Sequence, residues 1–363
     1  MLAFNNIFRE IHWLLDLLRR IGYAFGSSFA VAAISAPFVI KYLKNRKMEQ
    51  VLRSQNEVRN LAQLHSAKAR TPTMGGIIIA IATLCGTIPF VRWNSQVTLA
   101  IFCYLALAAV GLIDDLAKIR TQNTRGVPGR IKLLIQFTVA ATVAAVLHHY
   151  PDFYKTYTTL PIPFFGRALL LPSFGCFVIF LFFVLSGTSN AVNLTDGLDG
   201  LVTQCAIPIL LFFGVLAVLT GNIVTAAYCA FPHIPGNGEL AILCAATLGA
   251  LLVFLWHNGY PAVIFMGDMG SLSLGMLIGV VALLTNHPLH LVFVGGIFVL
   301  ETLSDVIQVA SFRYFGGRRV FRMAPIHHHF ELAGVHEVKI TRCFGMITWA
   351  LVLLGIFSLI IKI

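Results

Sequence analysis

The sequence predicts an all-α integral membrane protein, a bundle of ten transmembrane helices. Of its 363 residues, 58% are hydrophobic and only 11% are charged, whereas about a quarter of the residues in an ordinary soluble domain are charged. Apolar runs near the ~20 residues that a helix needs to cross a bilayer recur along the whole chain. They lie at 22–43, 72–91, 97–113, 131–149, 173–188, 201–220, 238–256, 269–286, 289–311 and 343–361. Because no stretch between them resembles a soluble domain, we expect one domain over 1–363.

The first 20 residues predict a helix that lies in the membrane interface. They carry acids and have no compact apolar core followed by a small-residue cleavage site, so they do not resemble a cleavable signal. Apolar residues follow helical spacing and leave the charged residues on the other face, as expected of a helix lying on a membrane. The apolar stripe consists of Phe4, Ile7, Phe8, Ile11, Leu14, Leu15 and Leu18.

The distribution of basic residues predicts the orientation of the bundle. A net charge of +11 would suggest a nucleic-acid partner for a soluble protein, but in a membrane protein Lys and Arg concentrate in cytoplasmic loops. The odd-numbered connections hold most of them, with eight at 41–71, five at 114–132 and six at 312–342. The even-numbered connections hold one at 92–96 and two at 149–172. We therefore expect the odd-numbered loops inside, both termini outside in the periplasm, and a lipid bilayer rather than nucleic acid as the partner.

The polar motifs lie in the odd-numbered loops or beside them. These motifs are HSAKARTPTMGG at 65–76, GLIDDLAK at 111–118, NAVNLTDGLDG at 190–200, HNGYPAVIFMGD at 257–268 and APIHHHFE at 324–331. A transporter would instead be expected to place its polar residues near the middle of the bilayer. We therefore predict an active site at the cytoplasmic face, formed by the loops 41–71, 114–132, 187–200, 257–268 and 312–342.

Three aspartates at the ends of predicted spans are candidates for metal and phosphate chemistry. Asp114 and Asp115 end the third span, where an acid is costly enough to indicate function, and Asp268 begins the eighth. Carboxylates are ligands for Mg²⁺, which usually takes one or two of them together with substrate phosphates. The alternatives are an exposed helix end with Asp114 paired to Lys118, and a helix cap for Asp268.

The segment 190–200 predicts a binding loop. Gly197 and Gly200 permit tight turns and close approach of the backbone to a ligand, and a plain polar turn is the alternative. Asn258 could hydrogen-bond a base and Phe265 could stack on it. The loop's polar side chains recur at three-residue intervals, at Asn190, Asn193, Asp196 and Asp199.

Three successive histidines, His327, His328 and His329, lie in a basic loop. On a helix they would point in different directions, so they cannot all bind one metal, and no Cys or spaced His completes a zinc site. They suit binding of phosphate and polar substrate groups, and a solvated basic face is the alternative. Glu301 and Asp305 share one face of the ninth span, where like charges repel, and the sequence assigns them no role.

These motifs together resemble the phospho-N-acetylmuramoyl-pentapeptide transferases, a family of the polyprenyl-phosphate sugar-1-phosphate transferases, over essentially the whole chain. The resemblance implies that UDP-N-acetylmuramoyl-pentapeptide and undecaprenyl phosphate react to give lipid I and UMP, with Mg²⁺ required. It also implies a homodimer in the bacterial cytoplasmic (inner) membrane. The rival readings are a UDP-N-acetylglucosamine transferase of the same superfamily and a lipid-linked sugar transporter. The motifs that carry the resemblance are TPTMGG, the Asp114–Asp115 pair, NAVNLTDGLDG, FMGD and PIHHHFE, in that order.

The resemblance also implies roles for individual residues. Asp114, Asp115 and Asp268 would be the essential acids, with Asp268 as the principal Mg²⁺ ligand and Asp115 as the second. Asn193 and Lys132 would line the diphosphate region, while His327, His328, His329 and Lys118 would contact the donor. The uridine pocket would consist of Lys68, Asp196, Gly197, Leu198, Asp199, Asn258 and Phe265. Two residues depart from the pattern, because His257 replaces an expected aromatic residue and Asp305 an expected apolar one.

The expected chemistry is a direct transfer, in which the polyprenyl phosphate attacks the donor and Asp114 removes any proton that remains on it. The acceptor is a phosphate monoester, whose second pKa is near ~6, so at neutral pH it is largely a dianion and already a nucleophile. A two-step scheme with a covalent phosphoryl-aspartate intermediate is the alternative.

Overall fold

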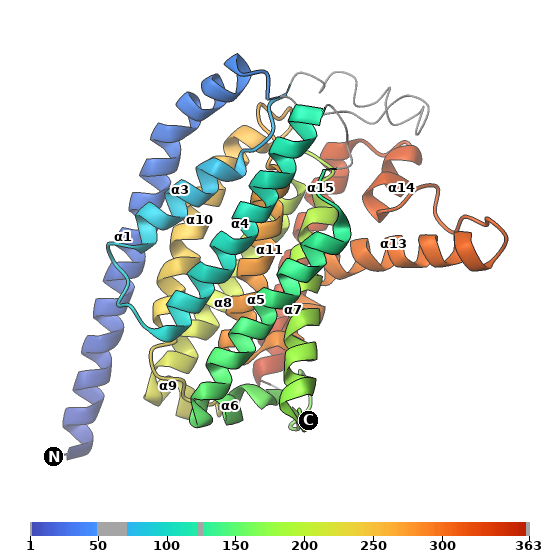
Figure 1. The fold of residues 1–363 in the computed structure, drawn as a ribbon. Helices are drawn as coiled ribbons and strands as arrows, with labels where there is room; N and C mark the ends of the chain where they lie inside the picture. Colours follow the sequence, from blue (N-terminus) through green and yellow to red (C-terminus); the bar gives the residue numbers. More distant parts are fainter. Residues whose placement is uncertain (1, 49–70, 122–125, 361–363) are drawn as a thin grey trace.

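A computed structural model describes residues 2–48, 71–121 and 126–360 of the chain. The protein is a bundle of long helices that run side by side, from which one helix, α13, projects sideways (Figure 1). The elements are α1 (Leu2–Asn45), α3 (Gly76–Thr87), α4 (Ser95–Thr121), α5 (Gly129–His149), α6 (Pro151–Thr158), β1 (Thr159–Pro161), β2 (Ala168–Leu170), α7 (Phe174–Thr195), α8 (Leu201–Gly221), α9 (Ile223–Tyr228), α10 (Glu239–Asn258), α11 (Gly267–Leu284), η2 (Pro288–His290), α12 (Leu291–Val294), α13 (Gly296–Tyr314), α14 (Ile326–Leu332) and α15 (Glu337–Ile360).

The expected helical membrane class is confirmed, but two of the ten expected spans take another form. Among the described residues, eight helices are long and apolar enough to cross a membrane, or nine if a bent pair counts as one span. The run at 72–91 forms α3, whose 12 residues extend only about 18 Å at 1.5 Å per residue. The run at 289–311 is not straight, because Pro288–Val294 and Gly296–Tyr314 meet at 81°. Gly295 separates the two pieces, and hydropathy alone does not report such a break.

The expected interfacial helix is not a separate element, because residues 2–20 are the first turns of α1. This single helix of 44 residues continues without interruption into the first apolar run. Arg20 explains why this segment stays with the bundle. Its guanidinium donates to Asp16 on the same helix at 2.9 Å and to Glu239, which begins α10, at 2.7 and 2.8 Å.

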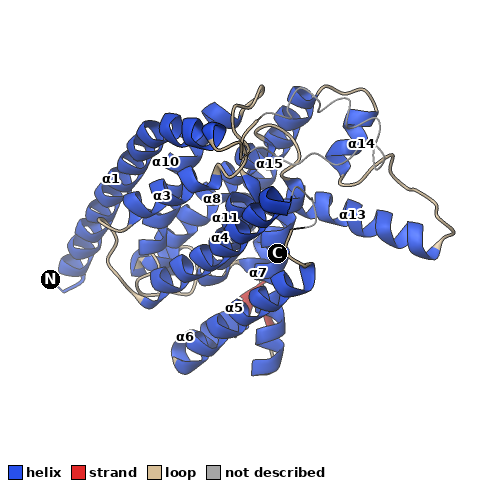
Figure 2. Ribbon diagram, turned by 45° about the horizontal axis from the view of Figure 1, so that its top comes forward, coloured by secondary structure: helices blue, strands red, loops and turns tan. Residues whose placement is uncertain are grey.

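A short hairpin is the one departure from an all-helical chain in the described residues. The strands β1 and β2 pair antiparallel with Thr159 opposite Leu170, in the connection between α6 and α7 (Figure 2). Each strand has only three residues, too short to give an alternating pattern in the sequence.

The helix α11 lies at the centre of the bundle and carries the start of the candidate site. Every residue from Gly270 to Leu284 is buried, and the helix contacts α3, α4, α7 and α8. Glycines allow this close packing. A Cβ at Gly111 of α4 would collide with the backbone of Asp268 and Met269, and one at Gly76 of α3 would collide with Gly270. The buried apolar residues form one cluster that extends from Leu17 in α1 to Val352 in α15.

Candidate active site

Two aspartates and two lysines form the centre of the candidate site. The Asp114 carboxylate is fully buried at 0% exposure. Its Oδ2 lies 2.7 Å from the Lys118 ammonium and 3.0 Å from that of Lys132. Oδ2 of Asp268 lies 3.1 and 3.0 Å from the same two ammonium groups. Each lysine therefore bridges the same pair of carboxylates. The sequence offered a simple pairing of Asp114 with Lys118 as the alternative to a functional role. This pairing is present, but as part of a larger cluster.

Four helices and one loop position this cluster. Asp114 and Lys118 stand one turn apart on α4, Lys132 lies in the first turn of α5, and Asp268 lies in the first turn of α11. The backbone amide of Val127 donates to Asp114 Oδ1 at 2.6 Å. From α7, the Asn193 amide donates to Asp268 Oδ1 at 3.2 Å and to the Ser271 hydroxyl at 2.8 Å. Both oxygens of each carboxylate are thus engaged.

Asp115 caps the start of α11 from the neighbouring helix. Its Oδ1 accepts from the backbone amide of Asp268 at 3.1 Å, and its Oδ2 accepts from that of Met269 at 3.0 Å. These amides have no acceptor within their own helix, and the positive end of the helix dipole favours a carboxylate there. Gly267 makes this possible, because its φ is +74° and a Cβ would lie 2.7 Å from Asp115 Oδ2. The helix-cap alternative weighed for Asp268 applies to Asp115 instead.

The loop after α7 lies against the loop after α10, and buried polar side chains join them. Asn258 accepts from the Gly200 amide at 3.1 Å and donates to the Ile264 carbonyl at 3.0 Å. Asp199 Oδ2 accepts from the Ala262 amide at 2.9 Å. Asn258, Asp199 and Leu198 are all buried. The structure therefore uses these three expected uridine contacts to hold the loop shape.

Three other expected uridine contacts, Asp196, Gly197 and Phe265, are half-buried rather than buried. Burial, and after it the nearby carboxylates of Asp268 and Asp115, raises the pKa of Asp196 to about 8. A carboxyl that keeps its proton at neutral pH can donate a hydrogen bond, as a carbonyl-rich base requires. Lys68 and most of the loop 41–71 lie outside the described residues.

The segment TPTMGG braces the Asp268 motif, a role that the sequence did not reveal. The amide of Phe265 donates to the Pro72 carbonyl at 2.8 Å, and the amides of Gly75 and Gly76 donate to the carbonyls of Phe265 and Met266 at 2.8 and 2.9 Å. The motif carries no side chain with an evident chemical role. The motif acts through its backbone hydrogen bonds, which cannot be predicted from the identity of its side chains.

The three histidines have three different partners. His327 Nδ1 lies 3.0 Å from Glu301 Oε2, His328 Nδ1 lies 2.7 Å from Glu331 Oε2, and His329 Nδ1 accepts from the Arg322 amide at 3.1 Å. Glu331 stands three residues after His328 on α14, a spacing visible in the sequence. The residue that replaces an expected aromatic one, His257, points Nδ1 at the Val253 carbonyl of its own helix, 3.0 Å away.

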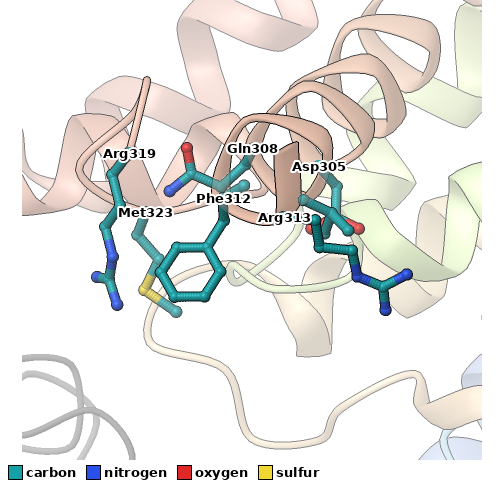
Figure 3. A pocket seen from close by; sticks show the side chains of 8 residues that line it. Asp305, Gln308, Phe312, Arg313, Arg319 and Met323 are labelled. Atoms are coloured by element: carbon teal, nitrogen blue, oxygen red, sulfur yellow. The ribbon is translucent and has the colours of Figure 1, made fainter. Parts of the chain in front are cut away.

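A groove runs between α13 and the segment 319–324 (Figure 3). Its volume is about 440 Å³, within the usual range of small-ligand sites. Gln308 holds its wall, because its Oε1 accepts from the amides of Val320 and Phe321 at 3.0 Å. Asp305 lines the groove and so does not need to face lipid, which explains an acid in an apolar run. The lining residues are Asp305, Gln308, Val309, Phe312, Arg313, Arg319, Met323 and Ala324.

The donor atoms of the site fit a magnesium ion that substrate phosphates help to hold. Within the described residues, no group of three or more His, Cys, Asp or Glu side chains could hold a metal by itself. Mg²⁺ does not need one, because it usually binds through one or two carboxylates and substrate phosphates. Asp268 is the better candidate ligand, because its carboxylate is 15% exposed and could exchange its contacts with Lys118 and Lys132 for the ion, whereas both oxygens of Asp115 accept backbone amides.

Comparison with known proteins gives a consistent result. A model of glycosyl transferase family 4 matches residues 97–286. A protein of Thermodesulfovibrio yellowstonii is 42% identical over 357 residues, covering 98% of this chain and 95% of the relative. A protein of Syntrophus aciditrophicus is 40% identical over 98% of this chain and 96% of its own length, and one of Desulfosudis oleivorans is 40% identical over 99% and 97%. All three relatives are named phospho-N-acetylmuramoyl-pentapeptide-transferase.

Proposed function

Because the chain belongs to glycosyl transferase family 4 and to the phospho-N-acetylmuramoyl-pentapeptide-transferases, we propose which reaction it catalyses. It transfers phospho-N-acetylmuramoyl-pentapeptide from UDP-N-acetylmuramoyl-pentapeptide to undecaprenyl phosphate, giving lipid I and UMP. This is the first membrane step of peptidoglycan synthesis. The observation that carries the proposal is the pair of lysines bridging Asp114 and Asp268, since it gathers cationic groups where two anionic substrates must meet.

The transfer proceeds in one step: an oxygen of the acceptor phosphate attacks the β-phosphorus of the donor from the side opposite the α–β bridging oxygen, a new P–O–P bond forms, and the bond to the bridging oxygen breaks to release UMP. The residues act mainly by positioning and charge neutralisation, from which phosphoryl-transfer enzymes obtain most of their acceleration. Lys118 and Lys132 offer ammonium groups to the approaching phosphates, and the buried Asp114 holds both in place. With Oδ1 on the Val127 amide and Oδ2 on two lysines, Asp114 is better suited to this task than to removing a proton.

Magnesium is the cofactor, and Asp268 is its protein ligand. When bound, the ion neutralises charge on the donor's diphosphate and on the departing UMP. Asp115, the second expected ligand, holds the Asp268 backbone through the cap on α11. Asn193 fixes the Asp268 carboxylate from the opposite side.

The donor spans the site from the 196–200 loop to the groove beside α13. The uridine lies against Asp196, Gly197 and Phe265, in the loops that Asn258 and Asp199 hold together. The muramoyl peptide extends past the histidines towards the groove, where Arg313 and Arg319 offer positive charge to its carboxylates.

The whole chain, 1–363, acts as one domain in the bacterial cytoplasmic membrane, with the site facing the cytoplasm and both termini outside. Supporting this orientation, the basic connections 41–71, 114–132 and 312–342 belong to the same set of loops as the candidate site residues. The enzyme works as a homodimer, as the family resemblance implies.

The test is release of UMP by membranes that contain the purified protein, with a panel of donors. Release from the muramoyl-pentapeptide donor in the presence of undecaprenyl phosphate and Mg²⁺ supports the proposal. Release only from UDP-N-acetylglucosamine would indicate the other branch of the superfamily. Release from neither donor, with movement of lipid-linked sugar between leaflets, would indicate a transporter.

A further inference from the structure

A histidine and a glutamate meet in the interior between α13 and α14. His327 is in the first turn of α14, and its Nδ1 lies 3.0 Å from Oε2 of Glu301 on α13. Both side chains are 0% exposed. The two residues are 26 positions apart in the chain, and their contact joins α13 to α14.

The buried carboxylate fixes which nitrogen of His327 carries a proton. A buried carboxylate is costly unless it accepts hydrogen bonds. Among the described residues, the imidazole is the only side chain within ion-pair distance of Glu301, and Glu301 Oε1 has no hydrogen-bond partner. The proton therefore resides on Nδ1, whether or not the ring is charged. Nε2 remains for another contact.

The free nitrogen of His327 faces the loop proposed to hold the donor. Nε2 is buried and has no hydrogen-bond partner in the described structure. A Cβ at Gly197 would collide with this nitrogen, so the glycine is what allows the ring edge and the loop to approach. Glu301 thus contacts His327, and His327 contacts Gly197 in the loop between α7 and α8.

We propose that Glu301 is a positioning residue, which acts on the donor through His327. It holds the ring and its tautomer so that Nε2 is presented at the Gly197 loop, where the donor binds. The inference rests on the proposed function for the identity of the donor. A carboxylate that orients a functional histidine in this way typically contributes about 10-fold to 100-fold, as known for the outer partners of metal-bound histidines.

The experiment is a double-mutant cycle on the full-length protein in membranes, with UMP release as the readout. We expect Glu301→Gln to lower kcat/KM for the donor by about 10-fold to 100-fold and to leave the acceptor's KM unchanged. Gln can turn its amide and offer either a donor or an acceptor to Nδ1, so it no longer selects one tautomer. In the His327→Ala background, Glu301→Gln should add no further loss, because the residue through which it acts is gone.

Two further variants keep the result interpretable. Glu301→Asp retains a carboxylate and should recover part of the loss, and it replaces Glu301→Gln in the cycle if that variant does not fold. Glu331→Gln is the matched control, because Glu331 contacts His328 on the same helix and its effect should be additive with His327→Ala.

The inference is overturned if Glu301→Gln, or Glu301→Asp in its place, costs the same factor with and without His327, or if it costs nothing. An absence of UMP release by the wild-type protein would refute the proposed function instead, so the two failures are distinct.

Discussion

The substitution Asp115→Asn tests whether this acid acts through the start of α11. In the structure the Asp115 carboxylate accepts two backbone amides, from Asp268 at 3.1 Å and from Met269 at 3.0 Å. An asparagine can accept only one of them through its carbonyl oxygen, and its NH₂ group would face the other amide as a second donor. The first turn of α11 would then lose its fixed position, and with it the Asp268 carboxylate.

The size of the effect follows from those two contacts. Losing one hydrogen bond to a charged group and leaving one amide in the interior unsatisfied costs about 2–4 kcal/mol in total. If the whole of that cost is added to the activation free energy, it lowers kcat/KM by about 30-fold to 1,000-fold.

The assay is UMP release over a range of Mg²⁺ concentrations. If Asp115 is mainly a cap, kcat falls and stays low at saturating Mg²⁺, because the displaced Asp268 carboxylate no longer holds the ion in the productive position. Recovery of activity at high Mg²⁺ would refute this reasoning and make Asp115 a metal ligand. Asp16→Asn is the matched control, because Asp16 pairs with Arg20 and Arg92 at the end of the bundle where α10 begins, away from the site.

Four more predictions follow from the site. Asp268→Asn abolishes turnover, and a rate above about one hundredth of the wild-type value would contradict its role as magnesium ligand. His328→Ala raises the donor's KM or lowers the donor's kcat/KM; a change confined to the acceptor's kinetics would be the wrong result. A donor made chiral with sulfur at the transferred phosphorus reacts with inversion, whereas retention, or a trapped phosphorylated aspartate, would establish two steps. Gly267→Ala, which must adopt φ +74° and place a Cβ 2.7 Å from Asp115, lowers both turnover and the melting temperature, and unchanged values of both would show that the cap tolerates a side chain.

The chemistry of the site was more predictable from the sequence than its contacts. Asp114 and Lys118 are four residues apart on a helix, so their pairing follows from helical spacing. Lys132 and Asp268 are 136 residues apart. Nothing in the sequence spacing indicates that both lie beside Asp114 and Lys118. The meeting of Asp268 with Asp114 and Lys118 depends on how closely α4 and α11 approach, which the missing side chain of Gly111 allows. The sequence shows the glycine but not what lies against it.

Hydropathy located the apolar helices and missed their geometry. Each apolar run corresponds to a helix, yet a run's composition does not distinguish a straight span from the break at Gly295 or from the 12 residues of α3. The role of Glu301 stayed hidden because its partner is distant in the sequence. Glu301 and Asp305 lie one turn apart on α13, as expected, but Glu301 contacts His327, 26 residues away, while Asp305 lines the groove.

The direction of α13 also limits how a second copy can dock. The helix leaves the bundle at 81° to the preceding piece, and its 19 residues extend about 28 Å at 1.5 Å per residue. On the side where this arm projects (Figure 1), it stands between the bundle and any neighbour in the plane of the bilayer. Two bundles that approached each other on this side would have to accommodate the arm, whereas faces turned away from it meet no such obstacle.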